Sequence, residues 1–138
     1  MSGNEAFLEL RAVHKHYPGS EGGPPLPILR DVHLRIGRGD TLAIIGASGS
    51  GKTTLLNLLG TLDRPDSGEL TLDGQDLARL DDEALARVRN RSIGFVFQFH
   101  YLLPHLSAIE NVILPTLATN RPARIPDELT AAFDAENA

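Results

Sequence analysis

Apolar and polar residues alternate in three segments of the chain, and this period of two predicts strands with one buried face. The segments are residues 7–13, 28–36 and 69–73. Residues 18–27, which separate the first two segments, are rich in Gly and Pro and predict a loop. We therefore expect three half-exposed strands in the first part of the chain.

Two further segments predict strands that are more deeply buried. Thr41–Ile45 is almost entirely apolar and does not alternate, which is typical of a parallel strand covered on both faces. Gly37–Asp40 predicts the turn before it. Ile93–Phe97 predicts another strand, which ends at Gln98.

Helical patterns fill much of the remaining chain. Thr54–Leu59 is an apolar stretch with helical character. Asp81 is a predicted N-cap, because its carboxylate can accept hydrogen bonds from the first helical turn, and the helix after it is expected to end near Asn90. Two later helices are expected, over Ala108–Leu114 and, after the polar residues 119–126, over residues 127–138.

The segment Gly46–Thr53 matches the pattern Gly-x-x-x-x-Gly-Lys-Ser/Thr of a phosphate-binding loop. A predicted strand precedes it and a predicted helix follows it, which is the context that this motif requires. The alternative is a surface loop rich in Gly and Ser, which the spacing, the Lys-Thr pair and the flanking elements disfavour. The motif predicts a site for a nucleoside triphosphate with magnesium.

The residue types of this loop suit a polyphosphate. Glycines allow positive φ and close approach, and backbone N–H groups at a helix start replace the water around phosphate. Lys52 brings a full charge to the β- and γ-phosphates, and the Thr53 hydroxyl is a hard oxygen ligand for Mg²⁺. Thr54 is expected either to reach the α-phosphate or to bond within the first helical turn. The predicted cofactor-binding residues of the loop are Gly46, Ala47, Ser48, Gly49, Ser50, Gly51, Lys52, Thr53 and Thr54.

Composition narrows the class of protein only a little. The 138 residues are 41% hydrophobic and 22% charged, as in ordinary globular proteins. The formal net charge of −5 does not favour nucleic-acid binding. The chain has no Cys, so neither a disulfide framework nor a thiolate metal site is expected. No apolar run approaches the ~20 residues of a membrane span, so we expect no direct span. The N-terminus has no basic segment followed by an apolar one, so we expect no secretory signal there.

Three further segments accompany the phosphate-binding loop: Val13–Tyr17, Asp63–Glu69 and Arg91–Gln98, whose glutamine lies about 45 residues after Thr53. Together they resemble the N-terminal half of an ABC transporter ATP-binding subunit, over roughly residues 6–118. A narrower resemblance, to the LolD subfamily of lipoprotein-releasing ATPases and to MacB-type exporters, is carried by Gly60–Pro65, Phe97–Pro104 and Ile109–Pro115.

The resemblance implies a fold and a division of the chain. The implied class is α/β, a partial P-loop NTPase of the ABC ATPase type. It has parallel core strands, an antiparallel β subdomain around the nucleotide and the start of a helical subdomain. Residues 1–118 would be the N-terminal part of the ATP-binding domain. Residues 119–138 would be a polar tail that begins an incomplete helical subdomain.

Two side chains outside the loop take roles through the resemblance. Tyr17 corresponds to the aromatic residue that stacks on adenine; alternatively it only caps a strand end before Pro18. Gln98 corresponds to the glutamine that meets Mg²⁺ or the attacking water, and otherwise is a polar residue that ends a strand. The predicted catalytic residues are thus Lys52 and Gln98, the metal-contacting residues Thr53 and Gln98, and the cofactors ATP and Mg²⁺.

The resemblance also implies partners and a location. The partners are a transmembrane permease subunit and a second ATP-binding subunit, and the location is cytoplasmic, peripheral on the inner face of the cell membrane. The activity would be ATP hydrolysis coupled to export or lipoprotein release.

The 138 residues depart from the family pattern in one respect. They contain no Leu-Ser-Gly-Gly-Gln signature, no apolar strand that ends in Asp-Glu and no switch histidine after one. We therefore expect a truncated cassette that is inactive and poorly stable alone. One alternative is a nucleotide-binding module without turnover. Another is a different P-loop enzyme such as a kinase or GTPase. It is disfavoured because no Asn-Lys-x-Asp motif occurs and because Tyr17 and Gln98 match the ABC family pattern.

Overall fold

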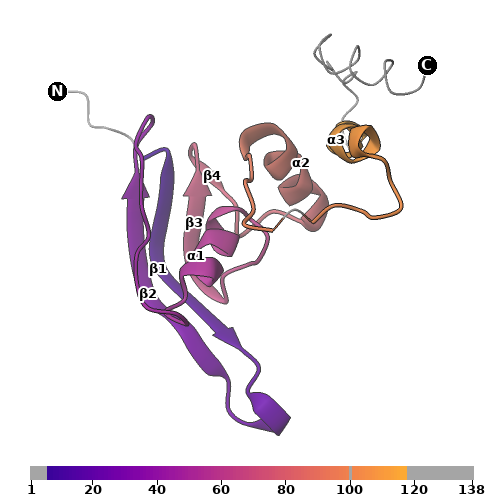
Figure 1. Cartoon of the computed structure of the whole chain (residues 1–138). Helices are drawn as coiled ribbons and strands as arrows, with labels where there is room; N and C mark the ends of the chain where they lie inside the picture. Colours follow the sequence, from indigo (N-terminus) through magenta and orange to yellow (C-terminus); the bar gives the residue numbers. More distant parts are fainter. Residues whose placement is uncertain (1–5, 100, 118–138) are drawn as a thin grey trace, which may run out of the picture. The chain divides into compact units, whose positions relative to one another are not determined.

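A four-stranded antiparallel sheet is the framework of the first part of the chain (Figure 1). The computed structural model describes residues 6–99 and 101–117, which divide into the units Met1–Ile93 and Gly94–Ala138. In the first unit the strand order is β2-β1-β3-β4. The strands are β1 (Leu8–Tyr17), β2 (Leu26–Ile36), β3 (Ser67–Leu72) and β4 (Gln75–Asp76).

The inward face of this sheet is the one that the alternation predicts. Leu10 of β1 pairs with Leu34 of β2 on one side and with Leu70 of β3 on the other, and only 1% of Leu10 is exposed. The register of β1 shifts between Leu10 and Val13, around Ala12 with its φ of 48°. This bulge leaves Val13 fully buried, so the apolar face continues across the irregularity.

Tight connections join the strands. Asp73 and Gly74 link β3 to β4 with φ values of 49° and 78°, the positive pair that a two-residue type I′ hairpin requires. A single 3₁₀ turn, η1 (Ser20–Gly22), lies in the Gly- and Pro-rich loop between β1 and β2, at the far end of the long hairpin in Figure 1. The loop expected over residues 18–27 is thus confirmed up to the start of β2, while β4 has no counterpart among the predicted strands.

Two helices complete the first unit, α1 (Lys52–Leu59) and α2 (Asp82–Ser92). Leu58 of α1 and Leu85 of α2 join Leu10, Val13 and Leu70 of the sheet in one buried cluster. Asp81 caps α2, since its Oδ1 accepts a hydrogen bond from the Ala84 N–H at 2.7 Å. Both predicted helices and the predicted cap are confirmed.

The second unit contains α3 (Ala108–Leu117), which extends three residues beyond the predicted end. Ser107 and Glu110 form a capping box at its start. The Glu110 carboxylate accepts from the Ser107 N–H at 2.7 Å, and the Ser107 hydroxyl lies 3.4 Å from the Glu110 N–H. The polar segment 119–126 and the helix expected over 127–138 lie outside the described residues.

Two predicted strands are wrong as elements. Thr41–Ile45 and Ile93–Phe97 have no strand assignment, and the strand pairs recorded within residues 6–99 and 101–117 are all antiparallel, so the expected parallel core is not among them. Some of their side chains are fully open, with Ile45 91% and Val96 102% exposed, while Ile93 packs against the buried cluster. A strand exists through hydrogen bonds to a neighbouring strand, and within residues 6–99 and 101–117 no strand pairs with either segment.

Candidate functional site

The predicted phosphate-binding loop leads directly into α1. Gly51 precedes the helix in a left-handed conformation, with φ 86° and ψ 6°. A Cβ there would meet Leu29 Cδ2 at 3.1 Å and Ile28 Cγ2 at 3.2 Å, so this glycine is needed both for its φ and for the close approach to β2. The loop is therefore seated against the sheet, and the unpaired N–H groups of the first turn of α1 lie at its end.

Lys52, the first residue of α1, folds its ammonium back over the loop. Its Nζ donates to the carbonyl oxygens of Gly46 at 2.9 Å and Ala47 at 2.6 Å, and lies 3.4 Å from the Ser50 hydroxyl. An ammonium has three donors and no acceptor, and here all three face oxygen atoms of one loop. A phosphate oxygen that replaced these acceptors would accept hydrogen bonds from the positively charged Lys52 ammonium within the same loop.

The next two positions of α1 differ in exposure. Thr53 is exposed and Thr54 is 8% exposed, because consecutive helical positions face different directions. The Thr53 hydroxyl is thus open to a ligand at the helix start, as the predicted magnesium contact requires. Thr54 packs toward the interior, and its contact with a phosphate remains a prediction.

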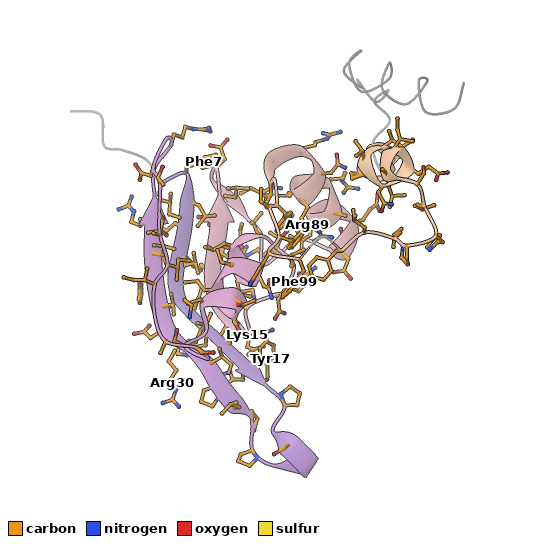
Figure 2. All side chains as sticks on the ribbon, in the orientation of Figure 1. Phe7, Lys15, Tyr17, Arg30, Arg89 and Phe99 are labelled. Atoms are coloured by element: carbon orange, nitrogen blue, oxygen red, sulfur yellow. The ribbon has the colours of Figure 1, made fainter. Side chains whose placement is uncertain are left out.

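Tyr17 ends β1 and is held by a carboxylate from a distant segment. Its hydroxyl donates to Asp63 Oδ2 at 3.0 Å, and the Lys15 ammonium lies over its ring, 5.4 Å from the centroid. Figure 2 shows Lys15 and Tyr17 next to each other toward the end of β1. The aromatic ring is therefore fixed at its hydroxyl end, while 36% of the residue remains exposed.

Lys15 and Asp63 form the centre of this cluster. Lys15, 8% exposed, donates to Asp63 Oδ1 at 2.7 Å and to the Arg64 carbonyl at 2.8 Å. Burial lowers the pKa of Lys15, but the hydrogen bond and charge of Asp63 outweigh it, so the pKa lies above its ordinary value. Burial likewise raises the pKa of Asp63, and the hydrogen bonds from Lys15, the Arg64 N–H and Tyr17 bring it below the ordinary value. Both groups are charged near neutral pH.

A second carboxylate ties the strand end to the same connection. Asp66 Oδ2 accepts from the His16 N–H at 2.5 Å, and Asp66 Oδ1 lies 3.8 Å from the Lys15 ammonium. The backbone hydrogen bond from His16 is the main cause that lowers the pKa of Asp66. The end of β1 is thus anchored by two aspartates from the segment between α1 and β3.

An open cavity of about 740 Å³ lies beside Tyr17. Its walls come from the end of β1 and the loop around η1, namely His16, Tyr17, Pro18, Gly19, Gly22, Gly23, Pro25 and Asp66. Lys15 and Asp63 are not among the lining residues. The cavity therefore reaches Tyr17 without Lys15 or Asp63 in its wall, while Asp66 does line it.

Gln98 belongs to the second unit and is exposed. Aromatic side chains surround it in the sequence, with Phe95 and Phe97 stacked at 5.4 Å and Phe97 edge-on to Tyr101 at 5.4 Å. The structure thus brings together the loop residues and α1, and separately Tyr17 with its anchor. The predicted role of Gln98 toward magnesium remains a prediction.

The anchor of Tyr17 was not expected from the sequence. Val13–Tyr17 and Asp63–Glu69 support the family resemblance, but neither Lys15 nor Asp63 has a predicted role. One signal was available: Lys15 continues the inward positions of Leu10 and Val13, and a buried ammonium requires a carboxylate partner. Which of the 18 acidic residues supplies that partner depends on the tertiary structure.

Within residues 6–99 and 101–117, no group of three or more His, Cys, Asp or Glu side chains is placed to hold a metal ion. None of the helices described is long and apolar enough to cross a membrane.

Comparison with known proteins identifies the family. The model of the ABC transporter family matches residues 29–137. The lipoprotein-releasing system ATP-binding protein LolD 1 of Rhodopirellula baltica is 51% identical over 116 residues, which are 84% of this chain and 50% of that protein. The macrolide export ATP-binding/permease protein MacB of Sodalis glossinidius is 48% identical over 116 residues, 84% of this chain and 18% of that protein.

A solved structure agrees with these relatives. The dimeric structure of MJ0796, described as a bacterial ABC transporter cassette, has a TM-score of 0.77 and 41% sequence identity, covering 88% of this chain and 51% of that one. A second structure of the same cassette is a post-hydrolysis state bound to ADP and Pi. The chain spans about half the length of the LolD proteins it matches. With the loop, the helix α1 that follows it and these matches in agreement, this chain belongs to the ABC transporter family of ATP-binding proteins.

Proposed function

We propose that this chain binds ATP with Mg²⁺, as the nucleotide-binding part of an ABC transporter ATPase. The observation that carries the proposal is the complete loop Gly46–Thr53 with the Lys52 ammonium held over it by carbonyl oxygens. The phosphates would lie on the loop and the N-terminus of α1, and adenine would stack on Tyr17. Residues 1–118 would act as one nucleotide-binding portion, and residues 119–138 would begin the helical subdomain.

Magnesium fits the residues at the helix start. It prefers hard oxygen ligands and keeps several waters, and the exposed Thr53 hydroxyl supplies one such ligand without demanding a preformed cage. Gln98 is the second proposed contact. When bound, the ion neutralises charge on the polyphosphate, while the chain supplies the loop N–H groups and Lys52.

The wider role follows from the relatives and is proposed on that basis. A LolD-like ATPase would couple ATP binding and hydrolysis to lipoprotein release, and a MacB-like one to export. Either would work through a transmembrane permease subunit and a second ATP-binding subunit, on the cytoplasmic face of the inner membrane. Catalysis in such a dimer would use Lys52 and Gln98 together with groups that these 138 residues do not contain.

ATP binding is tested by calorimetry on the 138-residue polypeptide with Mg²⁺, comparing the wild type with Lys52→Ala. We expect the substitution to weaken ATP binding by about 100-fold, since it removes a charge-assisted contact to phosphate of about 3 kcal/mol. Arg87→Ala serves as a control, because it removes a positive charge from an exposed position of the same unit, where Arg87 pairs only with Glu83 of the same helix among the ion pairs of the described residues. Equal ATP affinity of wild type and Lys52→Ala would contradict the proposal.

A second candidate function is a nucleotide-binding module without turnover. It concerns the 138-residue polypeptide by itself, for which turnover is not expected, since phosphoryl transfer needs several positioned groups at once and these residues contain no Leu-Ser-Gly-Gly-Gln segment. Phosphate release by the same polypeptide separates the two. Binding that depends on Lys52 without phosphate release supports the module, and turnover that depends on Lys52 supports an ATPase that is active as it stands.

A further inference from the structure

Asp63 links the two ends of the proposed nucleotide site. Its Oδ2 receives the Tyr17 hydroxyl at 3.0 Å and its Oδ1 receives the Lys15 ammonium at 2.7 Å. Lys15 and Tyr17 are two residues apart on β1, so their side chains share one face of the strand. One carboxylate therefore holds both side chains, with one oxygen for each.

The segment that carries Asp63 is itself fixed to α1. The N–H groups of Leu62 and Asp63 donate to the Asn57 carbonyl of that helix at 2.8 Å and 3.3 Å. The same helix begins at Lys52, in the phosphate-binding loop. A continuous path of backbone and hydrogen bonds thus runs from the loop through α1 and Asp63 to the Tyr17 ring.

The cavity reaches Tyr17 without the two groups that hold it most directly. The buried Lys15 ammonium lies over the ring, 5.4 Å from its centroid. The 740 Å³ cavity is lined by Tyr17 and Asp66 but not by Lys15 or Asp63. A flat base in this cavity would therefore meet Tyr17 without displacing Lys15 or Asp63.

We propose that Asp63 is a positioning residue, which fixes the Tyr17 ring relative to the phosphate-binding loop so that base and phosphates bind together. This inference rests on the proposed ATP site. A ring held in place loses little freedom when the base stacks on it, whereas a free ring must be ordered at that moment. The anchor therefore strengthens the contact with the base and leaves the contact with the phosphates unchanged.

The test separates base from phosphate by comparing Mg²⁺-ATP with Mg²⁺-tripolyphosphate, which has no base, in calorimetric titrations of the 138-residue polypeptide. Tyr17→Phe keeps the stacking ring and removes only its hydroxyl. We expect this variant to bind ATP about 3- to 10-fold more weakly, because the freed ring must be ordered when the base stacks on it. Its affinity for tripolyphosphate should equal that of the wild type.

Asp63→Asn provides an independent variant that removes the charge of the anchor. It should show the same selective loss. Combining it with Tyr17→Phe should weaken ATP binding little further, because both changes act on the same Tyr17–Asp63 hydrogen bond. Asp73→Asn is the matched control: Asp73 pairs with Arg38 on an exposed surface and its φ of 49° suits asparagine. Neither affinity should change in this control.

Three results would overturn the proposal. Unchanged ATP affinity in Tyr17→Phe would show that the ring alone is sufficient. An equal loss for ATP and tripolyphosphate in both variants would show a general loss of structure. Additive losses in the double variant would show that Tyr17 and Asp63 act separately. Failure of the ATP site itself is a different result, in which wild-type binding of both ligands does not depend on Lys52.

Discussion

Gly68 lies where the backbone of β3 closely approaches the backbone of β1. Its φ is +95°, and a Cβ built on it would lie 2.4 Å from the Ala12 carbonyl oxygen and 2.7 Å from the Ala12 carbonyl carbon. Ala12 is the bulge residue of β1, with its own φ of 48°. Two unusual conformations thus face each other, and the neighbour that a side chain would meet is backbone that cannot rotate away.

We predict that Gly68→Ala lowers the free energy of unfolding by about 3 kcal/mol, from strain at positive φ together with the contact to Ala12. Gly39→Ala is the matched control, because Gly39 has a φ of +83° but open space around its Cβ position. It should cost only about 1 kcal/mol. Urea unfolding followed by circular dichroism at low protein concentration measures both. Equal losses in the two variants would contradict the role assigned to the contact.

At the scale of elements, the sequence predicts best those strands that have a pairing partner within the described residues. β1, β2 and β3 alternate and bury a face that the alternation identifies, although β3 pairs with β1 across the intervening β2 and α1. Thr41–Ile45 has an equally clear apolar pattern but lies unpaired, with Ile45 91% exposed. Periodicity indicates which side chains are suited to burial, whereas a strand also needs a neighbouring strand for its backbone hydrogen bonds. That neighbour cannot be predicted from the segment alone.

The start of a helix, unlike the partner of a strand, can be predicted from a short segment, because a cap depends on residues close in sequence. Asp81 and Ala84 lie three residues apart, and the 2.7 Å hydrogen bond between them is the contact that the sequence predicts. Asp81→Ala should lower the free energy of unfolding by about 1 kcal/mol, while Asp81→Asn, which keeps an acceptor oxygen, should cost only a few tenths. The same urea titrations measure the difference. If both substitutions cost equally, the cap does not stabilise α2 through this hydrogen bond.

At the scale of the whole molecule, the candidate site has one part that the sequence predicts and one part that it does not. The loop Gly46–Thr53 is contiguous, so its residues and their roles can be predicted from the sequence. The anchor of Tyr17 joins residues 46 positions apart in the chain, and the ion pair of Lys15 with Asp63 joins residues 48 apart. Only the packing of α1 on the sheet brings these groups together, so no spacing rule could have found them.

The unpaired apolar segments lead to a prediction about the isolated 138-residue polypeptide. Open apolar backbone is a template for pairing with another chain, and Val96 is 102% and Phe97 53% exposed. We therefore expect the polypeptide to self-associate at micromolar concentration. Val96→Lys should weaken this association about 10-fold or more, because a charge on an exposed strand-like segment opposes edge pairing.

Sedimentation equilibrium over a range of concentrations measures this association, and Ala86→Lys supplies the control. Ala86 is exposed on α2, so the control adds the same charge to the surface of a formed helix and changes net repulsion equally. A loss of association in Val96→Lys alone assigns the contact to the apolar segment. An equal loss in both variants would mean that net charge governs association, and a monomeric wild type would mean that the exposed segments do not pair at all.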